Sequence, residues 1–298
     1  MKVKDVVKTW NNLSVDDHNR QLYIKDWHLR LRTNEDFYKT PHIFEDDWMN
    51  TYYLNNTSDD FRFVYVGSKD TFTGLHKDVY KSYSWSVNIR GRKLWRLFPP
   101  ICEQSLRYIP TNPASEIVYD VRNVDVKKFR NFANIKHLQI DIVQDEGQII
   151  FIPSGWYHQV ENLSDCISIN HNWCNSNCLL EMYKSMKVEI ETVMESIEDV
   201  KVLLIENNTN DDDDHEWKIE WLKIVQDLTI KDSGWSWPTF FNMINYNTKN
   251  DITIYKPQKE YVECIIKCII QDFSTNHQDE LKYLDDVRDS FNGLIENF

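Results

Sequence analysis

The sequence predicts a mainly β fold, a sandwich or a barrel, followed by a helical C-terminal region. Between residues 61 and 170, short runs of β-branched and aromatic residues alternate with turn residues. After about Cys178, apolar residues instead recur at helical spacing. The eleven Trp and fifteen Tyr residues suit a pleated interior, and 298 residues with 41% hydrophobic content provide a sizeable core.

The first sixty residues combine helical and extended patterns. Apolar residues at positions 3, 6, 7 and 10 repeat at helical spacing and predict a short amphipathic helix. Residues 22–29 are a strand-like run, and residues 35–60 are expected to form helical pieces and loops. Residues 1–60 are therefore predicted to be an N-terminal region of mixed structure.

Seven runs rich in aromatic and β-branched residues predict the strands of a β core over residues 61–175. They span residues 61–66, 84–89, 94–98, 139–143, 148–152, 157–160 and 166–170. Gly91 lies between the second and third runs as a turn residue. Residues 101–136 contain two prolines and form a long excursion, and long excursions inside a compact domain are often functional.

Residues 176–298 are predicted to be the helical C-terminal region. One apolar stripe at helical spacing runs from Leu179 to Val193, and a second consists of Tyr261, Ile265, Cys268, Ile269 and Phe273. The run Asp211–Asp214 is expected to be a solvated loop. The pairs Cys174/Cys178 and Cys264/Cys268 are one helical turn apart, a spacing that favours packed core thiols over a zinc site.

Net charge and cysteine usage limit the partners and the location. A formal charge of −13 disfavours direct binding of nucleic acid and favours a basic partner, although it also serves simple solubility. No signal peptide or membrane span is recognisable, and the six cysteines lack disulfide-scaffold spacing. We therefore expect reduced thiols, a cytoplasmic or nuclear location and no membrane partner.

Three side chains from two separate segments form a candidate metal site. His76 and Asp78 are alternate residues of an extended segment, so they point to the same face. His158 opens a later strand-like run, after a proline and a glycine turn. Two imidazoles and one carboxylate are the ligands of the facial triad that holds Fe(II) and leaves positions open. Taken singly, a His-x-Asp pair arises by chance and a lone histidine is usually a core residue bonded to a carbonyl.

Four further polar side chains suit a small anionic ligand beside the metal. Lys93 opens the third run, and a lysine in a β-rich pocket needs an anionic partner because burying an unpaired ammonium is costly. Thr73 could add a hydroxyl to the same anion, although a surface lysine and a turn threonine are the plainer interpretations. Asn170 and Asn172 share one face, and if that face is inward their amides could bond a co-substrate or a metal-bound water. His171 would point the other way.

Together these motifs resemble the JmjC family. The resemblance rests on Thr73-x-x-His76-x-Asp78, Gly91-Arg92-Lys93-x-Trp95-x-Leu97-Phe98-Pro99-Pro100, Ile152-Pro153-x-Gly155-Trp156-x-His158 and Asn170-x-Asn172. It implies a double-stranded β-helix of jelly-roll or cupin type and an enzyme that uses Fe(II), 2-oxoglutarate and O2. By position it implies that His76, Asp78 and His158 bind iron, and that Lys93 and Thr73 bind the co-substrate.

The resemblance also implies less certain co-substrate positions and a shortened N-terminus. Asn170 stands where relatives often have a threonine, and Ser86 stands where some relatives have an asparagine that binds the co-substrate. Asn88 lies two residues further on the same face. Relatives begin before the segment that matches Met1, so one sheet is expected to lack strands at an edge, and an exposed edge favours aggregation.

Within this family, the chain resembles a branch that hydroxylates a lysine of the eukaryotic translation termination (release) factor. One alternative is N-methyl-lysine demethylation by the same iron chemistry, although no reader module or basic chromatin-binding tail is evident. Another is an inactive or truncated β-helix that serves as a binding module, which would hold no stoichiometric iron. No oligomeric state is predicted.

Overall fold

The computed structural model describes residues 4, 8, 10, 21–33, 35, 37–108, 116–208, 215–249 and 259–298. The predicted N-terminal helix falls largely outside these residues, as does the acidic run Asp211–Asp214. The described residues form two compact units. The first lies within Met1–Phe37, Phe61–Asp78 and Tyr83–Asn172, and the second within Tyr38–Asp60, Val79–Ser82 and Trp173–Phe298. The division into regions 1–60, 61–175 and 176–298 stays a prediction.

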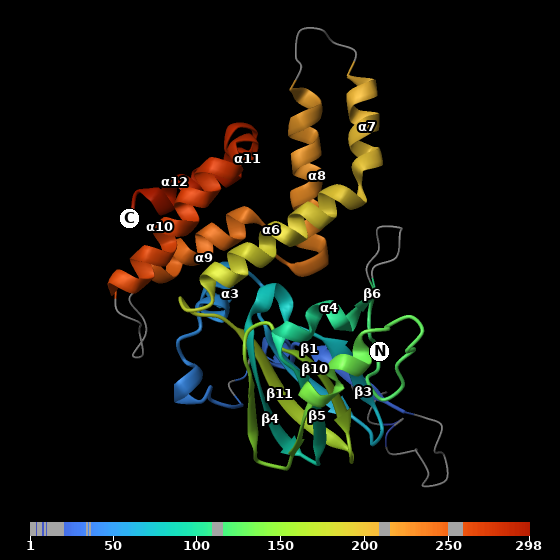
Figure 1. The fold of residues 1–298 in the computed structure, drawn as a ribbon. Helices are drawn as coiled ribbons and strands as arrows, with labels where there is room; N and C mark the ends of the chain where they lie inside the picture. The colour runs from blue at the N-terminus through green and yellow to red at the C-terminus, as the bar shows by residue number, and fades with distance from the viewer. Residues whose placement is uncertain are drawn as a thin grey trace. The chain divides into compact units, whose positions relative to one another are not determined.

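The first unit is built from two antiparallel sheets (Figure 1). A five-stranded sheet has the order β1-β2-β11-β4-β9, and its strands are Tyr23–Trp27, Arg62–Gly67, Cys166–Trp173, Tyr83–Arg90 and Ile149–Ile152. A four-stranded sheet has the order β3-β10-β5-β8, and its strands are Phe72–His76, Tyr157–Asn162, Lys93–Phe98 and Ile140–Gln144. The seven strands predicted after residue 60 are all present, and β3 is an additional one.

The strand order is that of a double-stranded β-helix. Successive strands from β2 to β5 alternate between the two sheets, and so do those from β8 to β11. Four strands of each sheet are therefore supplied by two interleaved halves of the chain. β1 adds one further strand beside β2. The predicted fold class, a jelly-roll or cupin-like β core followed by a helical region, is confirmed.

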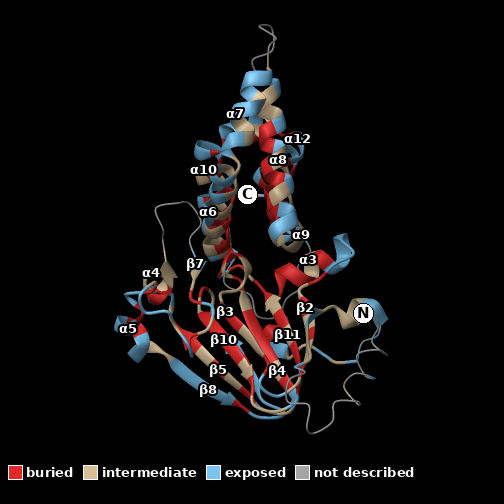
Figure 2. Ribbon diagram, turned by 90° about the vertical axis from the view of Figure 1, so that its right-hand side faces the viewer, coloured by how far each residue is buried: buried red, intermediate tan, exposed pale blue. Residues whose placement is uncertain are grey.

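Two apolar clusters hold the first unit together. Trp95, Leu97, Ile150, Ile152 and Val160 are buried between the sheets. The second cluster includes Leu75, Phe98 and Tyr157 together with seven buried residues of the excursion, so the excursion packs onto the four-stranded sheet. These seven are Cys102, Leu106, Val118, Val121, Phe129, Phe132 and Ile135. Buried residues line the strands in Figure 2, whereas β8 is mostly exposed. Within the excursion are α4 (Glu103–Leu106), β6 (Arg107–Tyr108), β7 (Glu116–Ile117) and α5 (Phe132–Ile135).

The second unit is helical. Its α-helices are α3 (Trp48–Asn56), α6 (Leu179–Ser196), α7 (Glu198–Asn207), α8 (Glu216–Ser233), α9 (Trp237–Lys249), α10 (Lys259–Asn276), α11 (Gln278–Tyr283) and α12 (Asp285–Ile295). Aromatic residues form much of its core, with Phe241 and Phe291 both packed against Phe273. The second unit also contains the short helices η1 (His42–Phe44) and η2 (Val79–Lys81), and the first unit contains α2 (Leu29–Thr33), η3 (Pro100–Cys102) and η4 (Lys136–Leu138).

The cysteines differ partly from expectation. Cys174 and Cys178 are buried as predicted, but Cys264 and Cys268 are exposed. The prediction that the second pair is part of the core was wrong, because the buried side of α10 is formed by Ile265, Ile266, Ile269 and Phe273. All six thiols are free. Among the described helices, none combines the length and apolar character needed to cross a membrane.

Candidate metal centre

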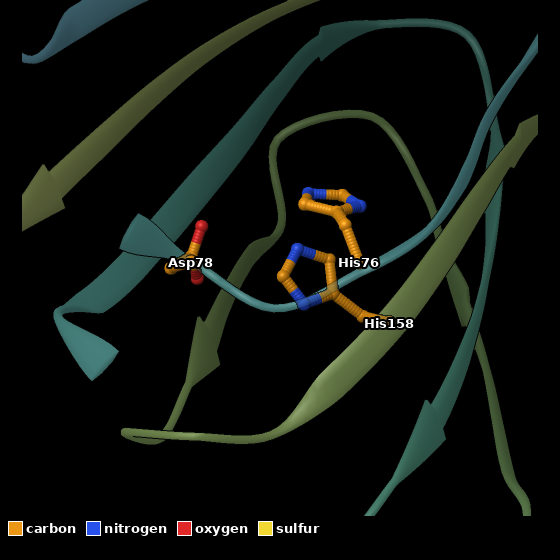
Figure 3. A group of neighbouring side chains, drawn as sticks. All are labelled: His76, Asp78 and His158. Carbon is orange, nitrogen blue, oxygen red and sulfur yellow. The ribbon is translucent and has the colours of Figure 1, made fainter. Parts of the chain in front are cut away.

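The two predicted histidines face one another across a strand pair. His76 ends β3, and its register partner on β10 is His158. Their ring centroids are 4.2 Å apart. One ligand atom each from His76, Asp78 and His158 lie within 4.8 Å of one another (Figure 3). Asp78 follows β3 by two residues, so the strand end and the turn after it supply two of three ligands.

Both imidazoles are oriented by backbone carbonyls. The Nδ1 atom of His76 lies 2.9 Å from the Gly74 carbonyl oxygen, and that of His158 lies 3.4 Å from the Trp156 carbonyl oxygen. A carbonyl oxygen only accepts hydrogen bonds, so Nδ1 is the donor of each ring and Nε2 is the nitrogen left for a metal. Metal-binding histidines are commonly fixed in this way, which suits the site to a metal ion.

The electrostatic setting keeps His158 neutral. Its side chain is only 4% exposed. Burial and, to a smaller extent, the neighbouring His76 lower the pKa of His158 to about 4, while Asp78 acts in the opposite direction. A neutral imidazole is the form that binds a metal ion, so no proton has to be displaced at neutral pH.

The Asp78 carboxylate is held by two donors. The Ser84 hydroxyl donates to Oδ2 at 2.8 Å, and the Asn172 amide donates to Oδ1 at 2.7 Å. Asn172 was predicted to contact a co-substrate, and in the structure its amide contacts the carboxylate of the candidate triad. Ser84 was not predicted. Alternation from Ser86 along the same strand is the signal that would have found it.

Lys93 is buried within the β core. Its side chain is 2% exposed, and its ammonium donates to the Asn162 side-chain oxygen at 3.0 Å. Burial lowers the pKa of Lys93 to about 8. Among the described residues, no carboxylate forms an ion pair with this ammonium. A buried cation with a neutral partner is well suited to bind an anion that enters the cavity.

A bulge brings Thr73 to the same cavity as His76. The register pairs are His76 with His158 and Thr73 with Val160, so three steps along β3 match two along β10. Because of the extra residue, the side chains that follow it along β3 point to the opposite face from the one that strict alternation would give. The backbone N–H of Leu75 donates a hydrogen bond to the Tyr119 carbonyl oxygen at 2.8 Å, so its partner is in the excursion and not in β10. The Thr73 hydroxyl lies 3.2 Å from the Tyr23 hydroxyl.

The remaining predicted polar residues lie at different depths. The Asn170 side-chain oxygen accepts hydrogen bonds from Ser86 and Ser168, each at 3.1 Å. Asn170 lines the cavity, and Ser86 lies behind it. Asn88 is fully buried and donates to the Gly91 carbonyl in the turn that precedes β5. Ser86 and Asn88 are not part of the cavity wall.

One cavity joins the candidate metal site to Lys93. It contains about 460 Å³ of space not filled by protein atoms, part of which is open to solvent. The predicted residues on its wall are Thr73, His76, Asp78, Lys93, His158, Asn170 and Asn172. Those not predicted are Tyr23, Tyr65, Ser84, Trp95 and Val160. Trp95 and Val160 follow Lys93 and His158 by two residues, so strand alternation could have identified them.

The residues fit a metal ion with open coordination positions. Two imidazole nitrogens and one carboxylate on neighbouring segments are the donor set of a non-haem Fe(II) site, and a cavity adjoins them. Fold and site together define a cupin-like β-helix protein with a two-histidine, one-carboxylate centre. The chain belongs to the family described as Cupin-like domain, which matches residues 1–178.

Curated relatives extend this similarity and confirm the resemblance to the JmjC family. The chain is 41% identical to JmjC domain-containing protein 1 of Schizosaccharomyces pombe over 77% of its own length and 47% of the relative. It is 41% identical to 2-oxoglutarate and iron-dependent oxygenase JMJD4 of Danio rerio over 67% and 48% of the two chains. Arginine-specific demethylase JMJ20 of Arabidopsis thaliana is 38% identical over 67% and 46%. The chain thus spans about half the length of these relatives.

Proposed function

We propose that the protein is an Fe(II)- and 2-oxoglutarate-dependent oxygenase that hydroxylates a lysine of a protein substrate. The observation that carries the proposal is the single cavity shared by the three candidate ligands and the buried Lys93 ammonium. The similarity to relatives named 2-oxoglutarate and iron-dependent oxygenases supports the same reaction class.

Each cavity residue has a distinct role in this proposal. His76, Asp78 and His158 would hold the metal on one face and leave its other face toward the cavity. Lys93 would pair with the distal carboxylate of 2-oxoglutarate, with the Thr73 hydroxyl beside it. When bound, iron, 2-oxoglutarate and O2 supply the oxidant that converts a C–H bond to an alcohol and releases succinate and CO2.

Other residues of the cavity would orient the ligands and limit water. Asn172 and Ser84 keep the Asp78 carboxylate in one orientation through their hydrogen bonds. Asn170 offers an amide to a bound ligand, with Ser86 fixing its rotamer. Trp95 and Val160 form an apolar part of the wall, which lowers the local dielectric and strengthens the pairing of Lys93 with an anion.

The proposed substrate is the eukaryotic translation termination factor, modified at the lysine of its Asn-Ile-Lys-Ser motif. Its basis is the resemblance of this chain to the branch of JmjC proteins that acts there. A cytoplasmic location, with no direct nucleic-acid partner, is part of the same proposal. The acidic net charge of −13 would favour the approach of a cationic target residue.

Demethylation of an N-methylated side chain is the second candidate function. A relative of 38% identity is named an arginine-specific demethylase, which is the observation that favours it. Both reactions use the same metal centre and differ in which C–H bond reaches it. The mass change of the substrate separates them, because hydroxylation adds one oxygen whereas demethylation removes a methylene equivalent.

Mass spectrometry of purified release factor provides the test. The factor is incubated with the full chain, Fe(II), 2-oxoglutarate and ascorbate, and His158→Ala is the matched control. We expect one added oxygen on the target lysine with the wild-type chain and none with the variant.

Three other outcomes separate the alternatives. If the chain binds iron and 2-oxoglutarate but adds no oxygen, the proposed substrate is wrong. Demethylation of methylated peptides under the same conditions would then favour the second function. If the purified protein binds no iron, both proposed reactions are contradicted, and the result favours the inactive binding module.

A further inference from the structure

The excursion after β5 carries a small excess of positive charge within an acidic chain. The whole sequence has 34 Lys and Arg residues against 47 Asp and Glu residues. Residues 101–140 reverse this balance, with six basic residues and four acidic ones. A local reversal of charge within an acidic protein marks a surface where an anionic partner is favoured over the rest of the molecule.

Four of these basic residues surround one hollow in the first unit. Arg107, Lys127, Lys128 and Arg130 lie around Tyr108 and Asn131, and the space there not filled by protein atoms, part of it open to solvent, is about 1240 Å³. Asp125 is the single acidic residue on the described wall. Its carboxylate accepts hydrogen bonds from the backbone amides of Lys127 and Lys128, so it caps the turn that presents these cations.

Two of the four cations remain available to a partner. Lys128 pairs with Glu116, and its ammonium lies 5.3 Å from the centre of the Tyr108 ring. Lys127 and Arg130 are exposed and form no ion pair with any residue that the structure describes. The Arg130 Nε atom donates to the Lys127 carbonyl at 3.3 Å, which keeps the two side chains on one turn.

The hollow is attached to the strands that carry the candidate metal ligands. Arg107 donates to the Glu103 carboxylate at 3.2 Å, and Lys77 donates to the same carboxylate at 3.0 Å. Lys77 stands between His76 and Asp78 in the sequence. Arg107 also lies 3.5 Å from the hydroxyl of Tyr157, the residue before His158. One wall of the hollow is therefore fixed to both ligand-bearing segments.

We infer that this cationic hollow binds an acidic stretch of the protein substrate and so holds the substrate beside the metal cavity. The inference rests on the proposed function for the identity of the partner as a substrate. Guanidinium and ammonium groups on one turn can pair with two or more carboxylates, and Arg130 offers a planar donor that matches a carboxylate. The Tyr108 ring adds an apolar surface against which side-chain methylenes can pack.

An acidic peptide fits the hollow better than a nucleic acid does. A nucleic acid carries charge along its whole length, and beyond the hollow its phosphates would meet a chain whose net charge is −13. A short acidic stretch within an otherwise mixed peptide confines its negative charge to the hollow. At physiological ionic strength, charges beyond about 8 Å are screened, so the local cations decide its affinity.

The binding test uses the full chain and three fluorescent probes. The probes are a ten-residue peptide with six glutamates, its glutamine analogue and a ten-nucleotide single-stranded RNA. Lys127→Glu/Arg130→Glu is the test variant, and Lys267→Glu/Lys282→Glu is a matched double charge reversal on exposed helical positions of the second unit. Anisotropy at physiological salt measures each dissociation constant.

We expect the wild type and the control variant to bind the glutamate peptide, and the test variant to bind it about tenfold more weakly. The glutamine analogue should bind none of the three proteins measurably. If both variants lose the same affinity for the glutamate peptide, the effect is due to net charge alone and the proposal is wrong. Tighter binding of RNA than of the glutamate peptide, lost only in the test variant, would assign the hollow to nucleic acid instead.

Turnover then separates this inference from the proposed function. With a protein substrate, the test variant should show a raised KM and an unchanged kcat, and succinate formation without protein substrate should not change. If the wild type forms no succinate, the oxygenase proposal is contradicted, but the peptide-binding result still tests whether the hollow binds an acidic peptide. An unchanged KM beside normal turnover would overturn the docking inference alone.

Discussion

At the scale of single residues, short local contacts prepare the candidate centre for a metal. The two histidines use the same device, a hydrogen bond from Nδ1 to a carbonyl two residues earlier in the chain. Asp78 is held instead by side chains of two other strands, Ser84 on β4 and Asn172 on β11. Each imidazole is thus oriented by the backbone of its own chain segment, whereas the carboxylate is oriented by side chains of the five-stranded sheet.

The donors to Asp78 should contribute to metal affinity. Ser84→Ala and Asn172→Ala each remove one hydrogen bond to the carboxylate, and we expect each to weaken Mn(II) binding about tenfold, as is usual for partners of metal ligands. Titration calorimetry measures the affinity. Ser86→Ala is the matched control, because Ser86 lies on the same strand but bonds to Asn170. An equal loss with Ser86→Ala would contradict the assigned role.

Lys93 should make stability depend on pH in the alkaline range. Its pKa is about 8 in the folded chain against 10.5 for an ordinary lysine, so the unfolded chain binds more protons between these values. The folded state is therefore penalised below pH 8, by roughly 3 kcal/mol, and the penalty fades as the pH rises toward 10.5.

Urea denaturation of Lys93→Met across this range measures the effect. The variant should gain most stability over the wild type at pH 7, and the gain should shrink toward pH 10. Lys69→Met, a change at an exposed lysine, should show no such trend. A difference between Lys93→Met and wild type that is constant with pH would show that the ammonium is not penalised by burial.

At the scale of elements, turns and bulges place the cavity residues. The bulge in β3 brings Thr73 and His76 to one wall, although they are three residues apart. The turn before β5 starts that strand at Lys93 and buries its ammonium. Gly91 in this turn has a φ of +84°, a conformation that side chains with a Cβ rarely adopt.

Gly91→Ala should destabilise the first unit. A Cβ atom at this position would lie 2.1 Å from the Asp165 backbone oxygen, so the turn must move. We expect a loss of about 2–4 kcal/mol in the free energy of unfolding, from strain and displacement together. Gly147→Ala is a matched control, because Gly147 has a φ of +79° but no atom near the added Cβ. Equal losses in both variants would mean that only backbone strain matters.

At the scale of the whole molecule, ligand binding should stabilise the folded chain. The three candidate ligands come from segments about 80 residues apart, so the complete site exists only when β3 and β10 are paired in the four-stranded sheet. Binding to the folded state alone adds about 2.7 kcal/mol when the ligand is at 100 times its dissociation constant. Mn(II) with 2-oxoglutarate should therefore raise the urea midpoint of the first unit's unfolding.

His158→Ala provides the control for this effect. The variant should show no shift with Mn(II), and Lys93→Met should keep the metal-dependent part and lose the part due to 2-oxoglutarate. Circular dichroism together with tryptophan fluorescence follows the transition. A shift of equal size in His158→Ala would place the metal elsewhere on the chain.

Much of the candidate site was accessible from the sequence because strands have a period of two. Alternation grouped His76 with Asp78 and Asn170 with Asn172, and the family motifs joined these pairs to His158 and Lys93. Seven strands were recognised from their β-branched and aromatic runs. Alternation could not predict the bulge in β3, because the extra residue is defined only by its pairing with β10.

The tertiary structure decided which residues touch. The bond from Asn172 to Asp78 joins residues 94 positions apart, and the cationic hollow joins β6 to a turn some twenty residues later. It also placed residues 38–60 with the C-terminal helices, a grouping that no local pattern predicts. Local sequence determined the ligand types and the strands that carry them. Their distances, their burial and the cavity they share depend on sheet pairing between distant segments, which the order of residues along one strand does not contain.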